Sequence, residues 1–212
     1  MQDRIVRHSG LDRLIHWVCA VCVLVLLATA FLPILGVEFA WVAIHWWTGF
    51  VLAAAVAAHI LRSLVAKPLG LVWIGLRDIH DALLVARRAL RISSEAEPKQ
   101  GKYSFAQKLI HFAFALVVLA AIVTGGLMMV KIDTPWWDRN PYWLSDDSWG
   151  IVYVVHGLAA LLLITMVMTH VYFALRPEKR MFLRAMIRGW ITTDEYAGRH
   201  DPDRWQGSSQ GD

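Results

Sequence analysis

Long apolar segments alternate along the chain with short polar or charged stretches. Each of the four apolar segments holds enough residues to cross the hydrocarbon core of a bilayer as a helix. They are residues 14–35, 41–66, 105–130 and 150–175. The last of them contains no Asp, Glu, Lys or Arg. The pattern predicts an all-α membrane protein, a four-transmembrane-helix up-down bundle.

Two shorter helical patterns lie outside these spans. Between the second and third spans, residues 73–90 place apolar side chains at helical spacing, with charged residues opposite and His80 on the solvated side. This predicts an amphipathic helix on the cytoplasmic face of the membrane. After the fourth span we expect a short basic helix through Met186, then a polar tail with a disordered end. The chain is thereby divided into a transmembrane domain, residues 1–176, and a cytoplasmic helix and tail, residues 177–212.

The composition is that of a membrane protein. Hydrophobic residues make up 57% of the chain and charged residues only 18%, and there are 11 Trp. The two cysteines, Cys19 and Cys22, form a CxxC inside the first span. Without a second cysteine pair, we interpret them as small core residues, and no disulfide framework places the chain in an oxidising compartment.

The basic residues gather on one side of the predicted bundle. Nineteen of the 21 Lys and Arg residues precede the first span, follow the fourth, or lie between or at the edges of the second and third. Only Lys131 and Arg139 fall on the other side. By the positive-inside rule, both termini and the loop between spans two and three lie in the cytoplasm. The basic excess is thus a topology signal, and no nucleic-acid partner is expected.

Histidines occur inside the spans at a repeated spacing. His156 and His170 lie fourteen residues apart in the fourth span, and His45 and His59 have the same spacing in the second. Fourteen helical residues rise about 21 Å and leave the two side chains about 40° apart on one face. An imidazole in hydrocarbon needs a partner, so such residues are functional candidates. The spacing suggests axial ligands for two metal centres stacked across the membrane; hydrogen bonds between helices are the alternative.

Depth in the bundle limits how these histidines pair. Only His45 and His156 fall toward the outer side, so they form the one available outer pair. Four histidines fall toward the cytoplasmic side: His16, His59, His111 and His170. His170 therefore has three candidate partners. Zinc or copper fits less well than haem, because both cysteines lie on one helix and neither depth holds a carboxylate. We predict a b-type cytochrome with two haems, each held by two histidines.

Several motifs give the chain a resemblance to a known family. They are DRLIHW at 12–17, IHWWTG at 44–49, GKYSFAQK at 101–108, VVHGLAALLLITMVMTHVY at 154–172 and RHDPDRW at 199–205. Over nearly its whole length the chain resembles the cytochrome b (gamma) subunit of membrane-bound, quinone-linked formate dehydrogenases. The resemblance implies that His45 and His156 hold the outer haem and that His16 and His170 hold the inner one. His59, which the family type lacks, remains an alternative inner ligand, a neighbour of a ligand or a quinone contact.

The resemblance also implies a quinone site beside the inner haem, formed by Ser104, Ala106, Gln107 and His170. The family type has Asn and Gly where this chain has Ser104 and Ala106. From the residues alone, a quinone needs an apolar slot and polar groups for its carbonyls, near a source of protons. The polar groups at the start of the third span are Ser104, Gln107, Lys108 and His111. The alternative is an ordinary interface in which Lys108 extends to the lipid headgroups.

The expected function is that of a membrane electron-transfer subunit with two haem b groups. It would pass electrons from an iron–sulfur subunit to menaquinone or ubiquinone in a bacterial or archaeal cytoplasmic membrane. A molybdenum or tungsten subunit would oxidise the substrate, which this chain would not do, and the complex could form a higher oligomer. Related cytochromes b also serve NiFe hydrogenases and other molybdenum enzymes, which leaves the substrate open. The alternative from another class is a non-redox anchor or proton relay.

Overall fold

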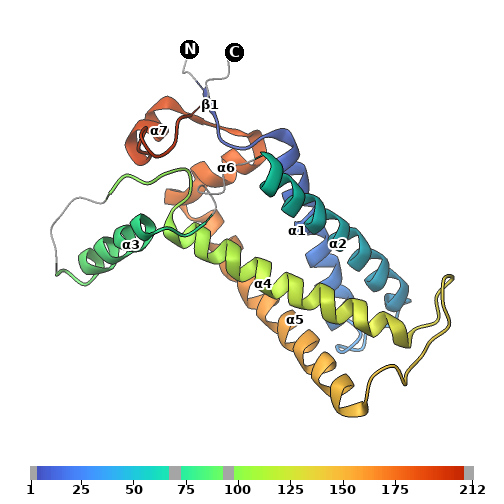
Figure 1. Cartoon of the computed structure of the whole chain (residues 1–212). Helices are drawn as coiled ribbons and strands as arrows, with labels where there is room; N and C mark the ends of the chain where they lie inside the picture. Colours follow the sequence, from blue (N-terminus) through green and yellow to red (C-terminus); the bar gives the residue numbers. More distant parts are fainter. Residues whose placement is uncertain (1–3, 67–72, 93–97, 208–212) are drawn as a thin grey trace. The chain divides into compact units, whose positions relative to one another are not determined.

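The computed structural model describes residues 4–66, 73–92 and 98–207 (Figure 1). In this part of the chain, four helices are long and apolar enough to cross a membrane, as predicted. They are α1 (Gly10–Phe31), α2 (Trp41–Ala66), α4 (Phe105–Met128) and α5 (Asp146–Leu175). Helices α1 and α5 each begin four residues before the predicted span. A short 3-10 turn, η2 (Met129–Lys131), follows α4.

The chain divides into two compact units, which are described separately. The bundle unit is Ile15–His59 with Phe114–Val171. The terminal unit is Met1–Leu14, Ile60–Ala113 and Tyr172–Asp212. The terminal unit thus contains the start of α1, the end of α2, the start of α4 and the end of α5. The predicted up-down order of the four long helices stays a prediction.

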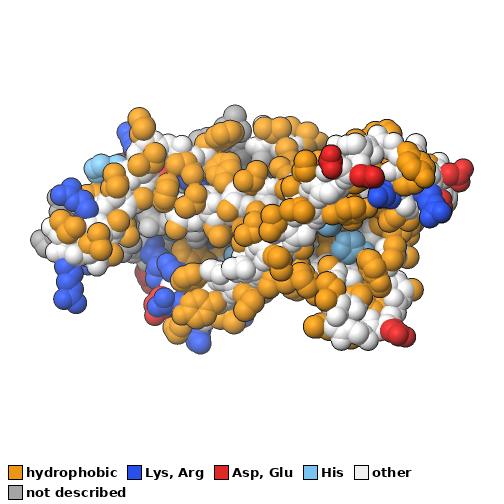
Figure 2. Space-filling view, turned by 90° about the horizontal axis from the view of Figure 1, so that it is seen from below, with side chains coloured by type: hydrophobic (Ala, Val, Ile, Leu, Met, Phe, Trp, Pro, Cys, Tyr) orange, Lys and Arg blue, Asp and Glu red, His pale blue; other side chains and the backbone are white. Residues whose placement is uncertain are grey.

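The bundle unit is held together by apolar packing between its helices. Cys22 and Val23 of α1 and Leu52 of α2 form its buried cluster. Partly buried residues of α4 and α5, among them Val118 and Val167, pack against this cluster. Many other large apolar side chains of these helices are exposed, and Figure 2 shows such side chains covering most of one face. An apolar outer surface of this kind is what a lipid environment requires.

The terminal unit contains a small sheet that joins the two ends of the chain. Strand β1 (Arg4–Val6) pairs antiparallel with β2 (Trp190–Thr192). Before β2 come a 3-10 turn, η3 (Pro177–Lys179), and helix α6 (Arg180–Arg188), and after it comes α7 (Thr193–Arg199). Residue Gly189 turns the chain from α6 into β2 with a φ of 93°. A Cβ at Gly189 would lie 3.0 Å from the His8 carbonyl oxygen, so glycine is needed there.

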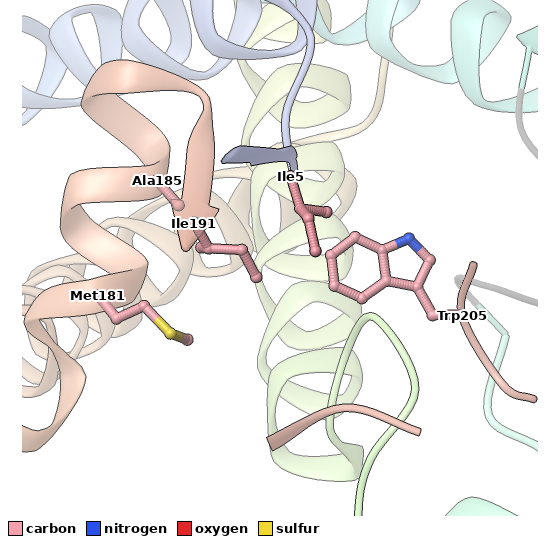
Figure 3. Packing of buried hydrophobic residues seen from close by; sticks show 5 residues of the cluster. All are labelled: Ile5, Met181, Ala185, Ile191 and Trp205. Carbon is pink, nitrogen blue, oxygen red and sulfur yellow. The ribbon is translucent and has the colours of Figure 1, made fainter. Parts of the chain in front are cut away.

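A compact core lies beneath this sheet. It consists of Ile5, Met181, Ala185, Ile191 and Trp205, and Figure 3 shows the Trp205 ring beside Ile5. The basic helix predicted through Met186 is confirmed as α6, but the polar tail predicted after it is instead folded as far as Trp205. The end predicted as disordered, residues 208–212, lies outside the described residues. The predicted boundary at residue 176 stays a prediction.

The predicted amphipathic helix is present as α3 (Leu76–Ala89). Apolar side chains such as Leu76 and Leu83 are exposed, as is His80. Asp78 is the exception on this helix, because it is buried. Its carboxylate accepts a hydrogen bond from the Gly75 backbone N–H at 2.8 Å and thereby caps the helix.

Candidate functional site

Two histidine pairs lie in the bundle unit. His45 of α2 faces His156 of α5, with their ring centres 6.3 Å apart and their planes 67° apart. His16 of α1 faces His170 of α5, again with ring centres 6.3 Å apart and planes 51° apart. Helix α5 therefore contributes one member to each pair. The first pair is the one that the depth argument predicts, and the second is the one that the family resemblance implies; the names outer pair and inner pair are kept for them.

The separation within each pair fits one metal ion between two imidazoles. A ring nitrogen binds a transition metal at about 2 Å, so two opposing rings on one metal have centres about 6 Å apart. A direct hydrogen bond between the rings would bring them closer together. Among the described residues, no group of three or more His, Cys, Asp and Glu could hold a metal ion. Coordination by two histidines, as in a b-type haem, fits the donors that are present.

Each histidine of the outer pair has a threonine partner. Thr29 Oγ1 lies 2.8 Å from His45 Nδ1, and Thr124 Oγ1 lies 2.9 Å from His156 Nδ1. Both threonines are buried. Contacts to Nδ1 leave Nε2 of each ring as the nitrogen available to a metal.

Gly125 brings the backbone of α4 close to the His156 ring. A Cβ at this position would lie 3.2 Å from Cε1 and 3.7 Å from Nδ1 of His156. At the neighbouring Gly126, a Cβ would meet nothing within 4 Å. Of the two glycines, only Gly125 is therefore required for packing. The group that it packs against is the ring of His156, a candidate ligand.

The inner pair, His16 and His170, is surrounded mainly by aromatic side chains. Phe114 lies 5.7 Å from His170 between ring centres, and Trp17 lies 5.4 Å from His16. His59 is near enough to His16 for an electrostatic interaction. Of the three candidate partners for His170, the structure brings His16 to it in a ring pair. His59 is a neighbour of His16. His111 is exposed and belongs to the terminal unit.

The predicted quinone residues of the third span lie at the start of α4. Ser104 and Gln107 form a capping box, in which Ser104 N–H donates to Gln107 Oε1 at 3.0 Å and Gln107 N–H donates to Ser104 Oγ at 3.2 Å. Ala106 is exposed on the same turn. The box occupies oxygen acceptors, so the Gln107 amide hydrogens and the Ser104 hydroxyl hydrogen remain as donors. His170, the fourth predicted member, belongs to the bundle unit.

Lys108 does not extend to the headgroups as the alternative interpretation supposed. Its Nζ lies 2.8 Å from Asp78 Oδ2, with both side chains less than a tenth exposed, and donates to the Trp73 carbonyl at 2.9 Å. Burial raises the pKa of Asp78, but hydrogen bonds from Lys108 and Gly75 and the charge of Arg204 outweigh it and hold that pKa below its ordinary value. Lys108 is therefore part of a buried ion pair.

This ion pair borders a cavity in the terminal unit. The cavity has a volume of about 540 Å³, within the range of small-molecule sites. Tyr103 and Lys108 from the start of α4 line it, together with Asp78 and Arg204. The three predicted quinone residues of the third span are one turn or less from these lining residues in sequence, but they do not themselves line the cavity.

A second buried polar cluster holds the segment that leads into α4. Arg7, 1% exposed, donates to His200 Nε2 at 2.9 Å and to the Lys102 carbonyl. His200 Nδ1 in turn donates to the Gly101 carbonyl at 2.8 Å. Burial lowers the pKa of Arg7 to about 10, and burial also lowers the pKa of His200. Because Arg7 is still charged at neutral pH, His200 must be neutral to accept its hydrogen bond.

The sequence pattern indicates the histidines but not their polar neighbours. Thr29 and Thr124 carry no signal of their own in an apolar helix, although each lies near the depth of an outer histidine. The helical spacing around Asp78 predicts a charged residue on a solvated face, whereas the structure buries it. His200 lies in the RHDPDRW motif, whereas Arg7 lies in none of the motifs named above, and no spacing rule connects residues 193 positions apart.

Comparisons with known proteins match nearly the whole chain to membrane cytochromes. The sequence profile of the family described as prokaryotic cytochrome b561 matches residues 7–189. The formate dehydrogenase cytochrome b556(fdo) subunit of Escherichia coli strain K12 is 26% identical over 219 residues, which cover 96% of this chain and 92% of that protein. The formate dehydrogenase cytochrome b556 subunit of Haemophilus influenzae is 26% identical over 220 residues, or 95% of this chain and 82% of that protein.

Proposed function

The chain belongs to the prokaryotic cytochrome b561 family, and on that premise we propose that it is the membrane subunit that delivers electrons to quinone in a formate dehydrogenase-like complex. Membership in the family implies a b-type haem. The observation that supports two haems is the pair of histidine couples with the same ring separation of 6.3 Å. His45 and His156 would hold one haem, and His16 and His170 the other.

The helices of the bundle unit give both haems an apolar surrounding with fixed ligands. Each haem, when bound, supplies a one-electron carrier whose potential depends on its ligands and their hydrogen bonds. The two ligands on α5 are fourteen residues apart, which places the couples about 21 Å apart along that helix. Apolar residues such as Leu52 and Val167 exclude water between them. The chain thereby supports electron passage from one membrane face toward the other.

The proposed partners follow from the names of the relatives. Both relatives are named as cytochrome subunits of a formate dehydrogenase. For this chain we infer an iron–sulfur subunit on the outer face and a molybdenum or tungsten subunit that oxidises the substrate. The distribution of basic residues supports cytoplasmic termini and a bacterial or archaeal cytoplasmic membrane. Another quinone-linked oxidoreductase, such as a NiFe hydrogenase, is the alternative setting.

The proposed quinone site lies at the cytoplasmic start of α4 and includes Ser104, Ala106 and Gln107. His170, which the family resemblance implies as a fourth member, belongs to the bundle unit. A quinone carbonyl accepts hydrogen bonds, and the capping box presents the donor hydrogens of Ser104 and Gln107 on a rigid first turn. Protons for the reduced quinone would come from cytoplasmic water. The nearby cavity bordered by Tyr103 is wide enough for a substituted ring.

The first experiment tests the haems. The purified chain should give a reduced-minus-oxidised spectrum with a b-type α-band, and extraction should release two non-covalent haems per chain. Quinone reduction should require both haems and the electron-donating subunits that purify with the chain. A haem-free protein with intact fold would overturn the proposal and leave an anchor or proton relay. Identification of the co-purifying catalytic subunit decides between formate and another substrate.

The second experiment tests the quinone site. Gln107→Leu should reduce quinone turnover at least tenfold while both haems stay bound and reducible from the partner side. Gln107→Glu keeps the capping oxygen but removes the amide donors, so it separates capping from quinone binding. Gln100→Leu, outside the helix, is the control. Unchanged quinone turnover in Gln107→Leu would exclude the start of α4 as the quinone site. His59 would then be the next candidate quinone contact.

A further inference from the structure

The outer histidine pair is distinguished from the inner one by two threonine hydroxyls. Thr29 of α1 lies against His45 of α2, and Thr124 of α4 lies against His156 of α5. Each outer histidine therefore meets a threonine on the long helix that precedes its own. The repetition in both halves of the bundle unit indicates a common role for the two contacts.

The direction of both hydrogen bonds follows from the hydroxyl hydrogens. Thr29 Oγ1 lies 2.9 Å from the Val25 carbonyl oxygen, and Thr124 Oγ1 lies 2.6 Å from the Ala120 carbonyl oxygen. A hydroxyl has one hydrogen, and in each threonine it is directed to the carbonyl one turn earlier. The oxygen can then only accept a hydrogen bond from the histidine. Both rings must carry their hydrogen on Nδ1, and Nε2 keeps the lone pair that binds iron.

The inner pair has no equivalent contacts. In the part of the chain that the structure describes, no hydroxyl or carbonyl accepts a hydrogen bond from the His16 or His170 ring, whose neighbours are aromatic rings and His59. The two haem sites thus share the same ligand type and ring separation but differ in what lies behind the ligands.

We propose that Thr29 and Thr124 are positioning residues that fix the outer ligands in the Nδ1–H form and lower the midpoint potential of the haem they hold. The inference rests on the proposed function, because it requires a haem at each pair. An imidazole that donates from Nδ1 is a more basic ligand through Nε2. A more basic ligand stabilises ferric relative to ferrous iron, so the haem gives up its electron more readily.

The consequence is a directional difference between the two haems. The inner haem, whose ligands have no such acceptors, keeps a higher potential. Electrons that arrive at the outer haem are therefore favoured to move toward the inner one, on the side of the proposed quinone site. The threonines would thus produce the difference in midpoint potential, although both haems have two histidine ligands.

The test is a redox titration of the α-band in the full chain with both haems bound. Thr29→Val and Thr124→Val should each raise the midpoint of one haem and leave the other unchanged, and the double variant should raise it further. Thr29→Ser and Thr124→Ser should restore the original midpoint. Thr165→Val is the matched control, since Thr165 hydrogen-bonds the Leu161 carbonyl at 3.3 Å but contacts no histidine. A His16→Ala background, which lacks the inner haem, identifies the component that moves.

Three outcomes would overturn the proposal: unchanged midpoints, a downward shift, or a shift confined to the inner haem. If a valine variant loses its haem, the comparison uses Thr→Ala and Thr→Ser at the same position, and equal midpoints in those two count against it. The absence of haem from the unmodified chain would instead refute the proposed function. If the chain binds two haems but their midpoint potentials do not change in the threonine variants, the proposed function stands and only the role of the threonines is refuted.

Discussion

The bundle unit and the terminal unit use polar side chains in opposite ways. In the bundle unit, buried polar groups are few, and Thr29 and Thr124 both contact a candidate haem ligand. In the terminal unit, long-range polar contacts such as Arg7–His200 and Lys108–Asp78 join distant parts of the chain. Buried polar groups therefore indicate cofactor binding in one unit and structural support in the other.

The largest expected effect tests the functional side of this contrast. His45→Ala or His156→Ala should leave about one haem per chain, because a haem that loses one of its two ligands is not retained. His16→Ala should remove the other haem. Haem content per chain, measured by extraction, checks both results. His80→Ala is the control. Two haems per chain in all the ligand variants would contradict haem binding by these histidines, and with it the contrast between the two units.

Haem binding at the outer pair can also be tested by adding side-chain atoms at Gly125, next to His156. Gly125→Val places branched atoms where even a Cβ lies 3.2 Å from the His156 ring, so the outer haem should be lost or bound in an altered geometry. Gly126→Val is the matched control, since nothing lies within 4 Å of its Cβ position. Absorbance and electron paramagnetic resonance spectra of the ferric haems check the result. Equal effects in both variants would mean that general helix packing is responsible.

The structural side of the contrast is tested at the buried ion pair. Asp78→Ala leaves the Lys108 ammonium buried without its carboxylate, which costs about 3–5 kcal/mol for a pair of this kind. Thermal unfolding of the purified chain should show the loss, with both haems present before the transition. Asp81→Ala, which removes a more exposed partner of Arg204, is the control and should cost about 1 kcal/mol or less. A specific loss of haem at low temperature would contradict a purely structural role.

The smallest effect is a pH dependence confined to the terminal unit. Burial, and to a lesser degree the charges of Arg7 and Arg199, lower the pKa of His200, so the unfolded state binds its proton more readily. The stabilisation is complete above the ordinary histidine value and is lost as the pH falls from that value through the lowered one. Hydrogen exchange of residues 190–205, compared with His200→Gln, measures it. Equal pH dependence in both proteins would exclude His200.

The sequence predicted the four spans but not where two of them begin. Hydrophobicity defines the middle of a membrane helix, whereas capping side chains define its end. Ser9 accepts a hydrogen bond from the Asp12 N–H at 3.1 Å, so α1 starts ahead of its apolar stretch. Ser145 accepts one from the Ser148 N–H at 3.4 Å and does the same for α5. The predicted spans, 14–35 and 150–175, leave these polar first turns out.

Helical spacing and the predicted alternation of the helices gave the outer pair, His45 with His156, whose rings do face each other. For His170 they left three candidate partners, and only the family resemblance implied His16. The sequence did not predict β1 and β2, since strands of three residues from opposite ends of the chain have no local pattern that connects them. Lys108 was misinterpreted for a related reason. Its partner Asp78 lies 30 residues away, beyond the reach of any helical periodicity.

The pairing of β1 with β2 makes the order of synthesis matter. The ribosome makes Arg7 first and its partner His200 193 residues later, after all four spans. Strand β1 therefore cannot pair until the last span has been inserted and the segment after it, which contains β2, lies on the same side of the membrane. A chain that stops early, or whose fourth span fails to insert, leaves a charged arginine without its site. The terminal unit can therefore close only after the fourth span and the tail that follows it have been made.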